Sequence, residues 1–312
     1  MVKLSVCITT YNRVASLDRT LKSLAAQTRL PDELIISDDC SPDDPVHVVD
    51  KWRDQFPRVR YNRNSRNLNM PGNLNAAMGL TTGEYVANLH DADEFDPSLL
   101  AEWEKALDVH PTAGFVFCGV GSNLHHKEFG NNVDLHDVLP FTTGHEFFER
   151  YFLHKFSSIV WGTVMARRSV YEELLPFDET FGFVSDVDMW MRMCFDHDVA
   201  YVRKPLIILD HSPTEERGSG TFNWKWLDIS RKMQEINIRH FYEDQPDIMH
   251  TELQHHYWIA QRVYAMRLLG RLKNLDWTGL RDGLRLCRNL HWPLKGLGFF
   301  SPNYGRGVGT RD

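Results

Sequence analysis

The stretch 84–97 constrains the fold of this chain more than any other part of the sequence. Its first half, Glu84 to Leu89, is β-prone and largely apolar, which predicts a buried strand. Asp91 and Asp93 follow directly, and Pro97 with helically spaced apolar residues behind it predicts a helix. In an open α/β sheet, ligands bind beyond the carboxyl ends of the strands. We therefore expect this acidic turn to lie at a ligand-binding edge.

Asp91 and Asp93 provide two hard oxygen donors, the ligand type that Mg²⁺ and Mn²⁺ prefer when they carry a substrate phosphate. The alternative is a plain acidic loop in which Asp96 caps the next helix. The position directly after a strand favours the metal site.

The first ninety residues alternate strands with helices. Strands are expected at 4–10, 34–37 and 59–61, ahead of the strand at 84–89. This alternation indicates right-handed βαβ units, so we predict an α/β fold with a mainly parallel central sheet flanked by helices. Neither G-x-G-x-x-G nor G-x-x-x-x-G-K-[ST] occurs in this half, which argues against a dinucleotide fold and a P-loop.

The second half has a looser pattern and ends in helices. We predict an α/β domain over residues 1–220 and a helical extension over 221–312. Within the first domain, the expected elements are a strand at 115–120, a loop at 121–144, a strand at 159–166, a helix at 168–175, a helix from Asp186 and a strand at 199–209.

Composition narrows the class of protein. The 312 residues carry a net charge of −7, which argues against nucleic acid as the main partner. Five cysteines at scattered spacing fit reduced thiols, and the sequence shows neither a signal peptide nor an apolar run of membrane-spanning length, so we expect a cytoplasmic protein. Oligomer formation is left open.

Residues 262–295 hold eight Lys and Arg residues against two Asp, interleaved with Leu, Trp and Val. This pattern predicts a pair of basic amphipathic helices that contact a membrane surface. The alternative is a solvated helical appendage packed on the core.

Four motifs in one order resemble an inverting family 2 glycosyltransferase of the GT-A fold. They are SVCITTYNR at 5–13, IISDDCS at 35–41, GEYVANLHDAD at 83–93, and SDVDMWMR at 185–192 after an RRS and an FDE. The resemblance covers about residues 4–211 and implies a nucleotide-sugar half at 1–110 and an acceptor half at 111–220. It assigns nucleotide binding to Thr9, Tyr11, Arg13, Asp38, Asp39 and Asp91, and metal binding to Asp91, Asp93 and His211.

The resemblance also implies that Asp186 is the general base that deprotonates the acceptor. The alternative is that Asp186 only caps its own helix. Ser185 departs from the family, which commonly has Glu before this Asp. Trp161 and Asp188 are assigned to the acceptor side, although a tryptophan in a strand is more often part of a core.

The activity implied is transfer of a sugar from a nucleoside diphosphate sugar, UDP first and TDP next, to a hydroxyl of a glycan or lipid-linked glycan, with Mn²⁺ or Mg²⁺. Two alternatives stay open. A sugar nucleotidyltransferase would need a glycine-rich basic loop after the first strand, and residues 9–15 are neither glycine-rich nor basic overall. A non-catalytic binder of nucleotide sugars or membranes would have no use for a base.

Overall fold

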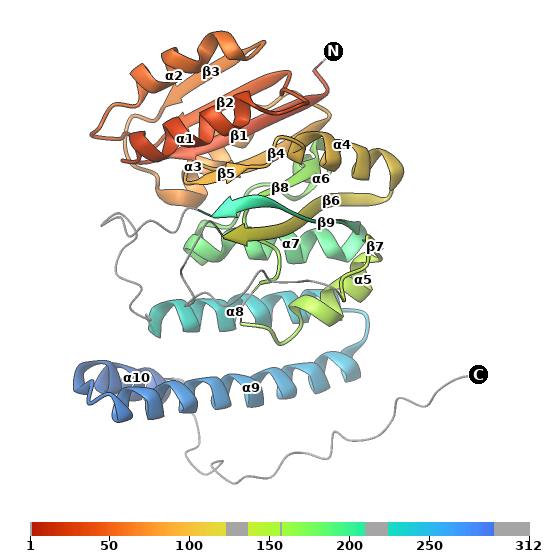
Figure 1. The fold of residues 1–312 in the computed structure, drawn as a ribbon. Helices are drawn as coiled ribbons and strands as arrows, with labels where there is room; N and C mark the ends of the chain where they lie inside the picture. Colours follow the sequence, from red (N-terminus) through yellow and green to blue (C-terminus); the bar gives the residue numbers. More distant parts are fainter. Residues whose placement is uncertain (1, 123–136, 157, 210–223, 290–312) are drawn as a thin grey trace. The chain divides into compact units, whose positions relative to one another are not determined.

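A computed structural model describes residues 2–122, 137–156, 158–209 and 224–289 (Figure 1). The chain forms two compact units, Met1–His256 and Tyr257–Asp312. Helix α8 (Trp224–Phe241) and the start of α9 (Pro246–Lys273) belong to the first unit. That unit therefore extends beyond residue 220, where we had placed the domain boundary.

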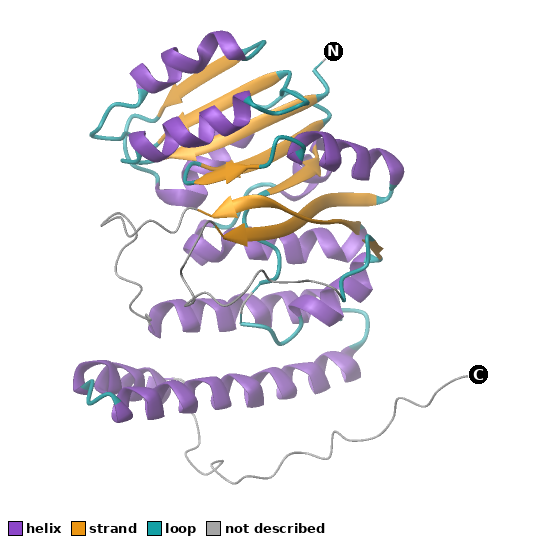
Figure 2. Ribbon diagram, in the orientation of Figure 1, coloured by secondary structure: helices purple, strands orange, loops and turns teal. Residues whose placement is uncertain are grey.

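The first unit is built on one sheet. Its described strands run in the order β3-β2-β1-β4-β8-β6-β9-β5, with β7 paired to β9 outside this path (Figures 1 and 2). The strands are β1 (Leu4–Thr10), β2 (Glu33–Asp38), β3 (Val59–Arg63), β4 (Tyr85–His90), β5 (Asp93–Phe95), β6 (Ala113–Ser122), β7 (Phe141–Thr142), β8 (Val164–Arg167) and β9 (Asp198–Leu209).

Strands β1 to β4 pair in parallel, as the βαβ pattern predicts, and α1 (Val14–Ala25), α2 (Val46–Trp52) and α3 (Asn69–Met78) connect them. The second half of the sheet is mixed. Strands β6 and β9 are parallel, whereas β8 runs antiparallel between β4 and β6, and β5 and β7 run antiparallel to β9. The α/β class is confirmed, and the parallel pairs are those among β1 to β4 and the β6–β9 pair.

Helices cover both faces of the sheet (Figure 2). Successive strand side chains point to opposite faces, so Leu4, Val6 and Ile8 pack with one helix layer while Cys7 packs with the other. The first layer contains α1, α2 and α4 (Leu99–Val109). The second contains α3, α5 (Gly144–Phe147), η2 (Phe148–Phe152), α6 (Arg168–Leu174), η3 (Glu179–Val184) and α7 (Ser185–Asp196).

The second unit is described as far as residue 289. It contains the rest of α9 and helix α10 (Trp277–Asn289). Among the described residues of the whole chain, no helix combines the length and the apolar character needed to cross a membrane.

Gly144 provides a test of how tightly α5 packs against α7. A Cβ at Gly144 would lie well inside the contact distance of the carbonyl oxygens of His197 and Cys194. Overpacking of this kind costs about 1–3 kcal/mol, so Gly144→Ala should lower the free energy of unfolding by at least that amount. Denaturant unfolding measures the change. Gly79→Ala is the control, because its Cβ would meet no atom closer than 3.6 Å; equal stability of the two variants would contradict the packing of α5.

Candidate functional site

The carboxyl ends of three parallel strands meet at one edge of the sheet. In the observed register, Thr10 of β1 pairs with Asp38 of β2, and Thr9 pairs with His90 of β4. The backbone N–H of Asp39 donates to the carbonyl of Thr10 at 2.9 Å. The predicted nucleotide-binding residues at the ends of β1, β2 and β4 are therefore brought together by the sheet itself.

Asp38 is completely buried and fully engaged within the protein. Its Oδ1 accepts a hydrogen bond from the backbone N–H of Ser41 at 2.9 Å. Its Oδ2 accepts from Tyr61 Oη at 2.8 Å and from Arg63 Nη1 at 2.6 Å. This carboxylate holds the turn after β2 against the end of β3.

Asp39 is also buried, but only one of its oxygens is engaged. Oδ1 accepts from the backbone N–H of Leu68 at 2.8 Å and from Asn64 Nδ2 at 3.0 Å. Asn64 is itself positioned by Asn73, whose Oδ1 accepts from Asn64 Nδ2 at 2.9 Å. No described residue donates a hydrogen bond to Oδ2 of Asp39, so this oxygen is available to a ligand at the sheet edge.

The turn after β1 lies beside these acids. Tyr11 is 46% exposed, and Asn12 adopts the left-handed backbone conformation with φ 54° while its N–H donates to Ser41 Oγ at 3.0 Å. Arg13 reaches across to β4, where its Nη1 donates to Oδ1 of Asp91 at 3.1 Å. Burial raises the pKa of Asp91, although the charge of Arg13 opposes the shift.

Asp93 is the first residue of β5, a short strand that the sequence did not predict. Its backbone carbonyl accepts from Thr20 Oγ1 at 2.7 Å, and its Oδ2 accepts from Trp161 Nε1 at 3.1 Å. Nδ1 of His90 lies 3.5 Å from the same Oδ2. Trp161 is 40% exposed, so it is not a core residue, and its indole N–H contacts the predicted metal ligand Asp93.

Gly162 brings Asp186 and His90 together. A Cβ at Gly162 would lie 2.6 Å from both Asp186 Oδ2 and His90 Nε2. These two atoms are therefore no farther apart than twice that distance. Asn88 of β4 fixes the glycine by donating from Nδ2 to its carbonyl at 2.9 Å. His90 thus stands between Asp93, on its Nδ1 side, and Asp186, on its Nε2 side.

Asp186 occupies the first turn of α7 and is not its N-cap residue, although its carboxylate accepts from a first-turn N–H. The N-cap position is Val184, and Oδ1 of Asp186 accepts from the adjacent N–H of Val187 at 2.7 Å. Burial raises the pKa of Asp186, and the nearby His90 opposes the shift. Burial by itself would lower the pKa of His90, but the hydrogen bond and charge of Asp93 outweigh it, so that pKa is raised.

Asp188 faces a different environment. It is buried, and its two oxygens accept from Arg192 Nε at 2.8 Å and from Asn237 Nδ2 at 2.9 Å. These contacts join α7 to α8, which favours a structural role over the predicted acceptor role. His211 lies outside the described residues.

The residues present fit a divalent cation. Asp91 and Asp93 are carboxylates with at most 4% of their surface exposed, and no described residue donates to Oδ1 of Asp93. Hard, partly unsatisfied carboxylate oxygens at a sheet edge are suitable ligands for Mg²⁺ or Mn²⁺.

Sequence reasoning assigned no role to Tyr61, Arg63 or Asn64. A usable signal existed for Arg63 and Asn64, which lie at the end of the third parallel strand and just beyond it, beside Asp38, whereas Tyr61 lies in the middle of that strand. Strand β3 is short and half-exposed, so its sequence pattern is weaker than that of the buried strands.

Comparison with known proteins gives the family. The model of glycosyl transferase family 2 matches residues 5–175, more than half of the chain. The GalNAc(5)-diNAcBac-PP-undecaprenol beta-1,3-glucosyltransferase of Campylobacter jejuni is 38% identical over 95 residues, 30% of this chain and 31% of that protein. Abequosyltransferase RfbV of Salmonella typhimurium is 36% identical over 109 residues, 34% of this chain and 32% of that protein. The aligned segments thus span about a third of these relatives.

Solved structures share the fold. TarS 1–349 of S. aureus, in complex with UDP-GlcNAc, aligns with a TM-score of 0.59 and 17% identity over 92% of each chain. The mannosyltransferase PcManGT of Pyrobaculum calidifontis, in complex with GDP-Man and Mn²⁺, aligns with a TM-score of 0.58 and 18% identity over 93% of this chain and 87% of that one. The GT-A architecture expected from the motifs is confirmed.

The family model covers Thr9 of β1, Asp39 in the turn after β2 and Asp93 at the start of β5. The chain therefore belongs to glycosyl transferase family 2.

Proposed function

We propose that this protein is an inverting glycosyltransferase that moves a sugar from a nucleoside diphosphate sugar to a hydroxyl of a glycan or lipid-linked glycan. The observation that carries the proposal is the row Asp93, His90, Asp186, in which a carboxylate suited to a metal and a carboxylate suited to a base flank one histidine. The relatives support the substrate class, because one is named for an undecaprenol-linked glycan and two structures hold UDP-GlcNAc and GDP-Man.

The donor nucleotide is assigned to the edge formed by β1 and β2. Oδ2 of Asp39 accepts the N3–H of uracil or thymine, while the engaged Asp38 supports the turn beneath it. The exposed ring of Tyr11 and the backbone near Thr9 form a wall beside the base. UDP is the first candidate and TDP the next.

Asp93 and Asp91 hold the divalent ion, Mn²⁺ or Mg²⁺, with His211 as a further predicted ligand. When bound, the ion neutralises the diphosphate and the charge that develops on it as it leaves. Trp161 and His90 orient Asp93, and Arg13 orients Asp91.

Asp186 acts as the general base. The acceptor oxygen forms a bond to the anomeric carbon, the bond from that carbon to the diphosphate oxygen breaks, and the hydroxyl proton passes to Oδ2 of Asp186. Attack from the face opposite the diphosphate inverts the anomeric centre. The raised pKa of this buried carboxylate makes it a stronger base than an exposed aspartate.

Nucleotide binding tests which nucleobase the donor carries and whether Asp93 binds the metal. Calorimetry of UDP, TDP, GDP and ADP in Mn²⁺ and then in EDTA should show metal-dependent binding of UDP or TDP alone. Asp93→Ala should abolish the metal-dependent part, because its buried oxygens are the proposed ligands. Glu94→Gln, at a half-exposed neighbouring carboxylate, is the control and should bind normally. Equal affinity of Asp93→Ala with and without Mn²⁺, matching the wild type, would remove Asp93 from the metal site.

The turnover rate and its pH dependence test whether Asp186 is the general base. Asp186→Asn should bind donor normally but lose about 10² or more in kcat, the usual contribution of a positioned base. Because only the ionised carboxylate accepts a proton, the wild-type rate should fall as pH drops through the raised pKa of Asp186, and this acid limb should vanish in the variant. Asp196→Asn, exposed at the far end of α7, is the control. A near-normal rate in Asp186→Asn would refute the assignment; donor binding without turnover by the wild type on any acceptor would favour a binding protein.

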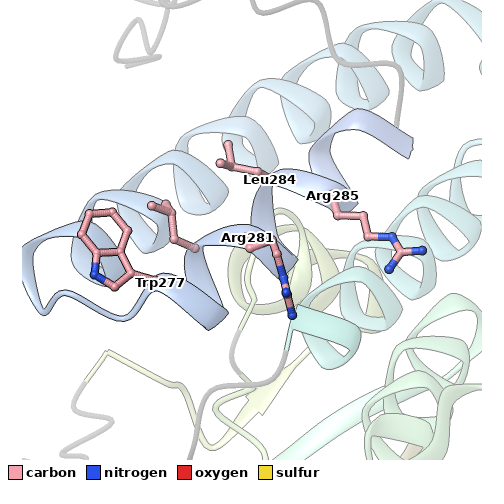
Figure 3. Close-up of a pocket in the computed structure, with 5 residues that line it drawn as sticks. Trp277, Arg281, Leu284 and Arg285 are labelled. Carbon is pink, nitrogen blue, oxygen red and sulfur yellow. The ribbon is translucent and has the colours of Figure 1, made fainter.

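We further propose that the protein works on the cytoplasmic face of a membrane and contacts it through α10. Residues 257–312 contain ten Lys and Arg and three Asp, a net charge of +7, whereas residues 1–256 carry −14. Trp277 and Leu284 are 63% and 50% exposed, and they project from α10 together with Arg281 and Arg285 (Figure 3). Exposed apolar side chains interleaved with basic ones are typical of interfacial helices.

Vesicle cosedimentation tests this contact. The chain should bind vesicles that contain anionic phospholipid and not purely zwitterionic ones. A basic residue near the surface is worth about 1 kcal/mol, so Arg281→Ala and Arg285→Ala should each weaken binding about fivefold. Arg60→Ala, at an exposed position of β3, should have no effect. Equal binding to both vesicle types would argue against an electrostatic membrane contact.

A further inference from the structure

A second group of metal-binding side chains lies outside the proposed donor and acceptor sites. It consists of His154, in the turn that follows η2, and Glu252 and His255 of α9. All three belong to the first compact unit. None of them takes part in the transfer reaction proposed above.

The three side chains converge on one point. Nε2 of His154 lies 2.7 Å from Oε2 of Glu252, and the rings of His154 and His255 have centroids 4.4 Å apart. One ligand atom from each residue lies within 4.8 Å of the other two. Glu252 and His255 are three residues apart on a helix, a spacing that places both on the same face.

The turn that presents His154 is held from within the fold. Gln234 of α8, which is 1% exposed, donates from Nε2 to the carbonyls of Phe152 at 3.0 Å and Lys155 at 2.7 Å. His154 itself has φ 61°, a left-handed conformation that non-glycine residues rarely adopt. Such conformations persist where the surrounding structure enforces them, and they are frequent at ligand sites. The backbone of the turn that presents this imidazole is therefore set by the fold.

The cluster is partly open to solvent. The side chains of His154 and Glu252 are 11% and 21% exposed, which leaves an approach for an ion and for water as a further ligand.

We propose that His154, Glu252 and His255 bind one Zn²⁺ ion that fastens the turn after η2 to α9. Two imidazoles and a carboxylate are a known ligand set for zinc, with water in the fourth position. Zinc bonds of about 2.0–2.1 Å place tetrahedral ligand atoms roughly 3.3 Å apart. The close His154 and Glu252 pair therefore opens slightly and His255 moves inward, by side-chain rotation alone.

Zinc titration of the full chain tests the site. The Asp93→Ala background weakens the donor metal site, where Asp91 remains, and the ligand variants below show whether the zinc that is still bound lies at His154, Glu252 and His255. Equilibrium dialysis with Zn²⁺ against a competing chelator should then find one tightly bound ion per chain. His154→Asn, Glu252→Gln and His255→Ala should each weaken it at least about 10–100-fold, the loss that even changes beyond the direct ligands produce.

Two choices keep the test decisive. Asn tolerates the left-handed conformation of position 154, and Gln at 252 retains the shape of the glutamate, so circular dichroism should show both variants folded. His250→Ala, at an exposed histidine on the same helix, should bind zinc like the parent. Co²⁺ in place of Zn²⁺ should give the visible absorption of a tetrahedral site, lost in the three ligand variants. Absence of bound zinc in the parent, or equal binding in the ligand variants and His250→Ala, would overturn the proposal and leave a hydrogen-bonded His154 and Glu252 pair.

Discussion

The parallel pairing of β1 with both β2 and β4 is the constraint on which the site depends. A fixed register places Thr10 beside Asp38 and Thr9 beside His90, so three turns leave the sheet at one edge. The register cannot slip by one residue, because the slip would move each buried side chain to the opposite face of the sheet. The packing of these buried strands therefore determines where the polar turns lie.

The acceptor side depends on contacts between residues far apart in the sequence. Asn88 points out of β4 and holds the carbonyl of Gly162, while Trp161 donates to Asp93. The orientation of α7 is secured at Asp188, whose oxygens bind groups from α7 and α8. The absence of a side chain at Gly162 is what lets Asp186 and His90 approach the same point.

The sheet edge follows from local strand patterns, whereas the region around Asp186 depends on contacts between residues far apart in the sequence. This difference explains which parts of the site the sequence could predict. Strands 4–10, 34–37 and 84–89 were predicted from local patterns, and topology rules then placed Asp39 and Asp91 at one edge. Strand β5 has three residues, too few for a period of two to appear, and β8 shares only three residues with the strand predicted at 159–166. The Trp161 to Asp93 hydrogen bond spans 68 positions, and no local pattern encodes it. The start of α7 at Ser185, with Val184 as its N-cap residue, could not be read from the sequence either.

The adjacent acids Asp38 and Asp39 differ in how their carboxylate oxygens are engaged. Arg63 compensates the charge of the fully buried Asp38, which leaves Oδ2 of Asp39 as the acceptor that we propose for the nucleobase. Uracil and thymine present an N–H donor to such an oxygen, whereas the matching ring nitrogens of cytosine and adenine are acceptors. A buried acceptor left unpaired costs about 1–3 kcal/mol, or roughly 5- to 150-fold in affinity. Guanine also carries a ring N–H, so this contact alone does not exclude it. Discrimination against guanine must therefore come from the room beside Tyr11, since a purine is larger than a pyrimidine.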